Sequence, residues 1–250
     1  MSASLSQIRI VLVETSHPGN IGSAARAMKT MGITSLYLVA PLIAPNDHTR
    51  ALASGAADLI AQAVVVDCLE DAIADCSLVV GCSARSRSIS WPTYSPRILA
   101  EKVRDLPGTE QVAVVFGQER SGLTNEQLDL CQYLVNIPAN PEYSSLNLAA
   151  AVQLICYEFR QTLMAENHGD AHDLQEPLAT QDDMARFYQH LWSALIKLGF
   201  LKPENPRQLK RRLTRLFNRF ELTQSETNLL RGMLSGVERQ ADIRRDSDSN

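Results

Sequence analysis

Residues 137–158, IPANPEYSSLNLAAAVQLICYE, determine how the middle of this chain folds. A short apolar run that ends at Ile137 has the composition of a strand. Pro138 and Pro141 then interrupt regular structure, because neither donates a backbone hydrogen bond and each fixes its own φ. From Leu148 onward, apolar residues recur at helical spacing. The stretch therefore predicts a strand, a stiff polar loop and a helix, in that order.

The polar loop in this stretch has two interpretations. It contains Ser144, Ser145 and Asn147, whose hydroxyl and amide groups could hold a polar ligand where a strand ends and a helix begins. It could instead be an ordinary strand-to-helix turn in which a Ser or Asn side chain caps the helix. Because short motifs often match by chance, the stretch alone favours the ordinary turn.

Strand-like and helix-like segments alternate on either side of this stretch, from residue 8 to residue 160. IRIVLV at 8–13 and VAVVF at 112–116 are the clearest strands. The alternation predicts an α/β domain with a mostly parallel sheet, and ligands of such sheets bind beyond the carboxyl ends of the strands. Four loops rich in Gly, Ser, Asn or Arg follow expected strands, at 14–20, 82–88, 117–123 and 138–147. Together they predict a binding site, although no dinucleotide or P-loop fingerprint is present.

Capping chemistry predicts where two of the helices begin. Asn20 precedes an Ala-rich run that ends at Gly32, and Asn is a favoured N-cap residue. Gly22 would let this helix approach another backbone closely. Thr124, followed by Gln127 three residues later, has the spacing of a capping box.

Composition indicates an ordinary globular protein. The 250 residues are 45% hydrophobic and 21% charged, with a net charge of −4. The five cysteines form no C-x-x-C pair, which predicts reduced thiols in the cytoplasm. No apolar run or signal segment predicts a membrane association. His168 and His172 have helical metal-ligand spacing but no third ligand nearby, so we expect no metal.

The character of the chain changes after residue 160. Residues 161–180 contain no Lys or Arg and read as a linker, which leaves a first domain at 1–160 and a helical domain at 181–250. The helical domain holds 13 basic and 9 acidic residues, with the positive charge concentrated at 202–219. This basic run is either a solvated helix face or a surface that contacts RNA phosphates. The candidate phosphate contacts are Lys210, Arg211, Arg212 and Arg215.

Three segments in the first domain resemble the three motifs of SPOUT methyltransferases, in particular the TrmH-like ribose 2′-O-methyltransferases. They are HPGNIGSAARAM at 17–28, VVFGQERSGLTNEQL at 114–128, and the stretch at 137–158. The match covers nearly all of residues 8–160. The resemblance implies a deep trefoil knot near the third motif, which general chain rules would not predict. It also implies bound S-adenosylmethionine and an obligate homodimer.

The resemblance also implies roles for individual residues. Its catalytic set is Asn20, Arg26, Glu119, Ser145 and Asn147, and the residues of the first motif would complete the partner's site. Its cofactor-binding set is Cys82, Ser83, Ala84, Gly117, Ile137, Ser144, Ser145 and Leu146. Cys82 is a departure, because relatives are expected to have Ser or Thr there. Arg26 would stabilise a developing alkoxide rather than act as a base, since the guanidinium pKa exceeds about 12.

The loop at 82–87 and the helical extension are most similar to the tRNA-modifying members of this family. The resemblance therefore implies methylation of a ribose 2′-hydroxyl in tRNA, at cytidine or uridine 32 of the anticodon loop, where single-stranded nucleotides are accessible. One alternative is a ribose in another RNA, such as rRNA. Another is a non-catalytic RNA-binding module of the same fold, against which the intact catalytic set argues.

Overall fold

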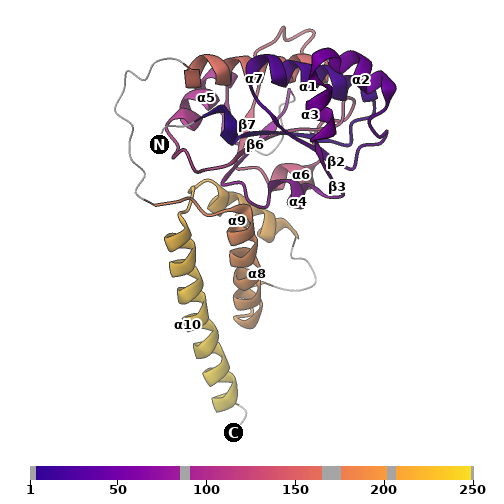
Figure 1. Ribbon diagram of the computed structural model, residues 1–250. Helices are drawn as coiled ribbons and strands as arrows, with labels where there is room; N and C mark the ends of the chain where they lie inside the picture. Colours follow the sequence, from indigo (N-terminus) through magenta and orange to yellow (C-terminus); the bar gives the residue numbers. More distant parts are fainter. Residues whose placement is uncertain (1–3, 85–90, 165–175, 202–206, 249–250) are drawn as a thin grey trace. The chain divides into compact units, whose positions relative to one another are not determined.

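The structure is a computed structural model that describes residues 4–84, 91–164, 176–201 and 207–248 (Figure 1). The chain divides into two compact units, Met1–Leu174 and Gln175–Asn250.

The first unit is built on a parallel sheet, as the sequence predicted. Its strand order is β3-β2-β1-β6-β4-β7-β5, and every pairing is parallel. The central strands β1 and β6 are buried along their whole length, which explains their continuous β-branched and apolar sequences. The described strands are β1 (Ile8–Val13), β2 (Ser35–Val39), β3 (Val64–Val66), β4 (Leu78–Cys82), β5 (Thr93–Tyr94), β6 (Val112–Phe116) and β7 (Tyr133–Val135).

Helices cover both faces of this sheet. In Figure 1, α1, α5 and α7 lie on one face, and α4 and α6 lie on the other. Gly22 allows α1 to pack against α2 as expected, since a Cβ at Gly22 would lie 2.1 Å from the Thr49 carbonyl oxygen. The described helices of this unit are η1 (Leu5–Gln7), α1 (Pro18–Met31), α2 (Asp47–Ala53), η2 (Ser54–Ala56), α3 (Ala57–Ala61), α4 (Leu69–Ile73), α5 (Pro96–Arg104), α6 (Asn125–Asp129) and α7 (Leu148–Met164).

The parallel arrangement places the loops that follow β1, β4, β6 and β7 at the same edge of the sheet, because the carboxyl ends of these strands all point there. These are the loops that the sequence singled out. Of the loop that follows β4, residues 85–88 lie outside the described residues. The trefoil knot stays a prediction, since strand order alone does not define how the loops thread.

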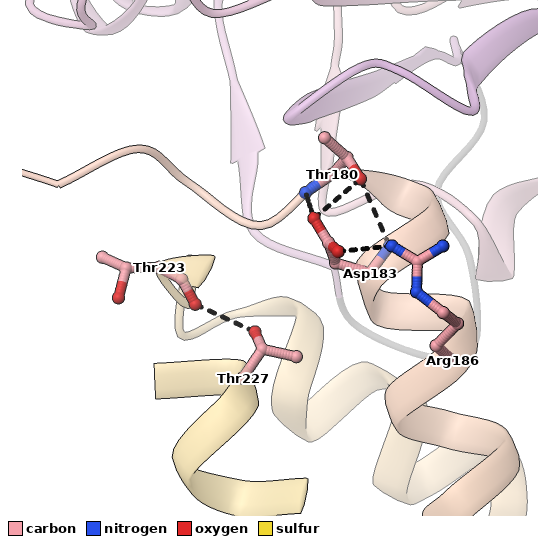
Figure 2. A network of polar contacts seen from close by, with 5 residues as sticks. All are labelled: Thr180, Asp183, Arg186, Thr223 and Thr227. Carbon is pink, nitrogen blue, oxygen red and sulfur yellow. Dashed lines mark hydrogen bonds and ion pairs between the residues drawn. The ribbon is translucent and has the colours of Figure 1, made fainter. Parts of the chain in front are cut away.

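The second unit is helical, with α8 (Gln181–Lys197), α9 (Arg207–Asn218) and α10 (Gln224–Asp248). Its core includes Met184, Phe187 and Leu191 of α8. Figure 2 shows how polar contacts fix the helix starts in this unit. Thr180 and Asp183 form a capping box at the start of α8, and Arg186 pairs with Asp183 at 2.5 Å.

The boundaries of the predicted linker differ from the elements observed. Helix α7 continues to Met164, four residues beyond the expected end of the first domain. At the other end, Leu178 and Ala179 are buried in the second unit, where the Ala179 N–H donates to the Leu222 carbonyl at 2.8 Å. The C-terminal end of the predicted linker, which is otherwise mostly polar and acidic, is therefore part of the second unit, because its apolar side chains are buried there. His168 and His172 lie outside the described residues.

Candidate active site

A cleft of about 220 Å³ opens at the carboxyl edge of the sheet in the first unit. A single water needs only about 10–15 Å³ by the same measure, so the cleft can hold a much larger ligand. All eight residues of the predicted cofactor-binding set line it: Cys82, Ser83, Ala84, Gly117, Ile137, Ser144, Ser145 and Leu146. The structure thus brings together three loops that are far apart in the sequence.

Other lining residues were not predicted as contacts. They come from the same loops and from the first turn of α7, and are Phe116, Gln118, Glu119, Arg120, Gly122, Leu148 and Ala151. Glu119 was predicted as catalytic, and the neighbours in its loop could have been proposed from their position alone.

Asn136 connects two sides of the cleft, although it was not among the predicted site residues. Its Nδ2 donates to the Ser83 carbonyl at 2.9 Å. The Ser83 N–H in turn donates to the Val135 carbonyl at 3.0 Å. The loop after β4 is therefore fixed to the end of β7. The only available signal was that Asn136 directly precedes Ile137.

Gly117 is required by the protein's own backbone. A Cβ at Gly117 would lie 2.2 Å from the Gly122 carbonyl carbon and 2.3 Å from the Leu123 nitrogen. The loop closes on itself here, since the Gly122 N–H donates to the Gln118 carbonyl at 2.8 Å. Gly122 has φ +69°, which favours glycine. These two glycines therefore shape the cleft wall before any ligand is considered.

Cys82 carries a neutral thiol. Burial raises the pKa of this thiol to about 12, so the thiolate is scarce at physiological pH. A neutral thiol is a poor nucleophile. A cysteine at position 82, where Ser or Thr was expected, is thus compatible with an electrophilic ligand in the cleft.

Glu119 is the centre of a polar network at the side of the cleft. The Ser16 N–H and Oγ donate to Glu119 Oε2 at 3.0 and 2.7 Å. The His17 N–H and Asn20 Nδ2 donate to Glu119 Oε1 at 3.3 and 2.9 Å. Partial burial acts to raise the pKa of Glu119, but the hydrogen bonds from Asn20 and Ser16 outweigh it and lower the pKa to about 2. Glu119 is therefore a carboxylate at neutral pH.

The network continues into α7 through Asn147. Asn147 Nδ2 donates to Asn20 Oδ1 at 3.0 Å. Asn147 Oδ1 accepts from the N–H groups of Ala149 and Ala150 at 2.9 and 3.4 Å, so this side chain caps α7. Both interpretations of the polar loop therefore apply, because the capping residue is also part of the network.

The prediction that Asn20 caps α1 is wrong. The helix begins at Pro18, and its N-cap is His17, whose Nδ1 accepts from the Gly19 N–H at 3.2 Å. Pro is favoured in the first turn because its missing N–H is not needed there. Asn20 thus lies inside the helix, and its amide is available to bridge Glu119 and Asn147.

Two residues of the predicted catalytic set lie outside this network. Ser145 is exposed and lines the cleft. Arg26 is exposed on α1 and does not line the cleft of its own chain. Its guanidinium has no hydrogen-bond or ion-pair partner among the described residues.

The basic residues of α9 are held in different ways. Arg212 is exposed, whereas Lys210, Arg211 and Arg215 are half-buried. Lys210 Nζ lies 5.5 Å from the centre of the Trp192 ring, within reach of a cation–π interaction. Arg212 is therefore the one member of the predicted phosphate-contacting set whose side chain is exposed.

The described residues provide neither a metal-binding cluster nor a membrane-spanning helix. Within them, no cluster of three or more His, Cys, Asp or Glu side chains could hold a metal ion. None of the described helices is long and apolar enough to cross a membrane.

Known proteins resemble both units of this chain. The SpoU rRNA Methylase family model matches residues 7–157, and the model of the tRNA methyltransferase TrmJ C-terminal domain matches residues 182–246. A tRNA (cytidine/uridine-2′-O-)-methyltransferase TrmJ from Photorhabdus laumondii is 52% identical over 240 residues, covering 95% of this chain and 99% of that protein.

Solved structures agree with these matches. TrmJ from Z. mobilis ZM4 superposes with a TM-score of 0.80 at 35% identity, covering 92% of this chain and 98% of that one. A probable methylase family protein from Haemophilus influenzae Rd KW20 has a TM-score of 0.63 at 47% identity, covering 96% and 100%. The chain therefore belongs to the SpoU methylase family and, within it, to the TrmJ methyltransferases.

Proposed function

We propose that this protein transfers a methyl group from S-adenosylmethionine to the ribose 2′-hydroxyl of a cytidine or uridine in tRNA, at nucleotide 32 of the anticodon loop. The observation that carries the proposal is the 52% identity to TrmJ across 95% of the chain. A tRNA substrate implies a cytoplasmic enzyme.

The cleft fits S-adenosylmethionine in chemical terms. Phe116, Ile137 and Leu146 offer apolar surface for a nucleoside, while the Ser144 and Ser145 hydroxyls are exposed in the same lining. The neutral thiol of Cys82 would not attack a sulfonium. When bound, the cofactor supplies an electrophilic methyl group, so the reaction needs no metal.

The protein must align the ribose hydroxyl with this methyl group and stabilise the charge that develops on the oxygen. Four hydrogen bonds stabilise the Glu119 carboxylate and thereby lower its affinity for a proton. Glu119 therefore does not act as the base. We assign it, with Asn20 and Asn147, to holding three loops in place. Ser145 lines the cleft and is assigned to orienting the bound groups.

Arg26 is assigned to the developing alkoxide in the cleft of a partner subunit. Its guanidinium is exposed on α1 and lies outside the cleft lining of its own chain. A homodimer in which α1 of one protomer faces its partner's cleft would give Arg26 a function. A guanidinium donates hydrogen bonds but does not accept a proton at neutral pH, so it serves as a stabiliser.

The second unit is assigned to tRNA binding through α9. Phosphate contacts from Lys210, Arg211, Arg212 and Arg215 would position the RNA without reading its sequence.

The test is to incubate the protein with unmodified bulk tRNA and labelled cofactor and then map the labelled nucleotide. We expect label on the ribose of C32 or U32. The Arg26→Ala variant serves as the inactive control. Label confined to rRNA in a parallel reaction would move the substrate to another RNA, and no transfer with intact cofactor binding would favour a non-catalytic RNA-binding protein.

The dimer needs its own test. An Arg26→Ala protomer and a cleft-defective protomer should complement each other after subunit exchange. At equal mixing, half of the dimers are mixed and each has one intact site, so about a quarter of the wild-type sites should be active. No recovery after demonstrated exchange would place Arg26 in its own chain's site.

A further inference from the structure

Ser16 donates more hydrogen bonds to Glu119 than any other described residue. Its backbone N–H and its Oγ both reach Glu119 Oε2, at 3.0 and 2.7 Å. The two residues are 103 positions apart in the chain, so this contact joins the loop after β1 to the loop after β6. Ser16 belongs to none of the residue sets assigned above.

The backbone before Ser16 adopts an uncommon conformation. Glu14 has φ +50°, a region that few non-glycine residues occupy. Its N–H donates to the Val39 carbonyl at 2.8 Å, at the end of the neighbouring strand. The chain thus turns sharply where β1 ends, and Ser16 and His17 follow directly with their N–H groups on Glu119. Backbone conformations of this kind are concentrated at functional sites, where they fix the position of neighbouring groups.

The contacts beyond Glu119 show what Ser16 could control. Glu119 Oε1 accepts from Asn20, and Asn20 Oδ1 accepts from Asn147, which caps α7. Asn20 is in the same helix as Arg26, and Asn147 follows the serines of the cleft lining. A shift of the Glu119 carboxylate would therefore reach both the helix that carries Arg26 and the loop that carries Ser145.

We propose that Ser16 is a positioning residue for methyl transfer, which holds the Glu119 carboxylate and through it keeps Asn20 and Asn147 in place. This inference rests on the proposed function. It assigns Ser16 no contact with the substrate or cofactor. The low pKa of Glu119 agrees with it, because both Ser16 donors stabilise the charged form.

The experiment compares Ser16→Ala, which keeps the backbone donor and loses the hydroxyl, with Ser16→Thr, which keeps both. Ser95→Ala is the matched control, since Ser95 caps α5 and lies outside the network and the cleft lining. Loss of a hydrogen bond to a charged group corresponds to roughly a 10- to 150-fold change in an equilibrium or rate constant. We expect Ser16→Ala to lower the single-turnover rate of tRNA methylation by about tenfold or more, with cofactor affinity unchanged. Ser16→Thr should restore most of the rate.

A second measurement distinguishes positioning from general stability and does not depend on the reaction. The Glu119 carboxyl can be titrated by NMR in each variant. Ser16→Ala should raise the pKa of Glu119, because a donor to the carboxylate is lost, whereas Ser95→Ala should leave it unchanged. A wild-type rate in Ser16→Ala, or an equal loss in Ser95→Ala, would overturn the inference. If the wild type methylates no tRNA, the proposed function fails, and an unmoved Glu119 pKa in Ser16→Ala would then also reject the role of Ser16.

Discussion

The polar network around Glu119 and the basic helix α9 hold their polar side chains in different ways. In the network, Ser16 precedes α1, Asn20 lies in α1 and Asn147 precedes α7, and each of these side chains makes hydrogen bonds within the protein. In α9, the basic residues are neighbours on one helix, and Arg212 is exposed. Chemistry on a ribose needs groups fixed from several directions, whereas attraction of a phosphate backbone needs only positive charge at the surface.

Arg26 tests this comparison most strongly. Arg26→Ala should reduce methyl transfer by about 100- to 1,000-fold, the usual effect of removing one donor to a developing oxyanion. Cofactor affinity, measured by titration calorimetry, should be unchanged because Arg26 is assigned to the ribose oxygen of the substrate and not to the cofactor. Turnover close to the wild type would falsify the assignment.

Gly117 tests how rigid the cleft must be. Gly117→Ala should weaken cofactor binding by about tenfold or more, because the added Cβ collides with the backbone at Gly122 and Leu123 and must displace the loop. Gly55→Ala is the matched control, since a Cβ at Gly55 would meet nothing within 4 Å. Equal cofactor affinity of the two variants in calorimetry would show that the loop can adjust at little cost.

Arg212 tests the second half of the comparison. Arg212→Gln should weaken tRNA binding modestly and reduce the slope of log affinity against log salt concentration by about one, since one phosphate contact is lost. Arg50→Gln removes an exposed charge from the first unit and should leave the slope unchanged. Binding isotherms at several salt concentrations measure both. An unaltered slope in Arg212→Gln would make this residue part of a solvated face.

The smallest effect is expected from pH. The pKa of Glu119 is lowered to about 2 from an ordinary value of 4.5, so its hydrogen bonds stabilise the fold above pH 4.5 and this contribution is lost as pH falls toward 2. The methylation rate should therefore show no titration of Glu119 between pH 5 and 9. The difference in unfolding free energy between the wild type and Glu119→Gln should shrink between pH 4.5 and 2 in denaturant titrations. A constant difference over that range would contradict the assignment of the low pKa to these contacts.

The sequence alone determined the elements of the fold. Periodicity identified the buried strands β1 and β6 and the helix α7, and the capping box at Thr124 and Gln127 is present as predicted. It also identified the loops that form the cleft, because loops at the carboxyl ends of parallel strands must share one edge. Each of these signals is local, so a single segment of sequence is enough to show it.

The tertiary structure decided what the side chains do. Asn20 has the local chemistry of an N-cap, yet Pro18 starts the helix earlier and the amide of Asn20 bridges Glu119 and Asn147. Gly117 resembles a ligand-binding glycine, yet its missing Cβ is needed by the backbone of its own loop. The loop at 14–20 was singled out from its composition, but nothing in the sequence distinguished Ser16 within it, because its partner lies 103 residues away. Local propensity fixes where a helix or strand forms, but only packing of distant segments brings a donor to a particular carboxylate.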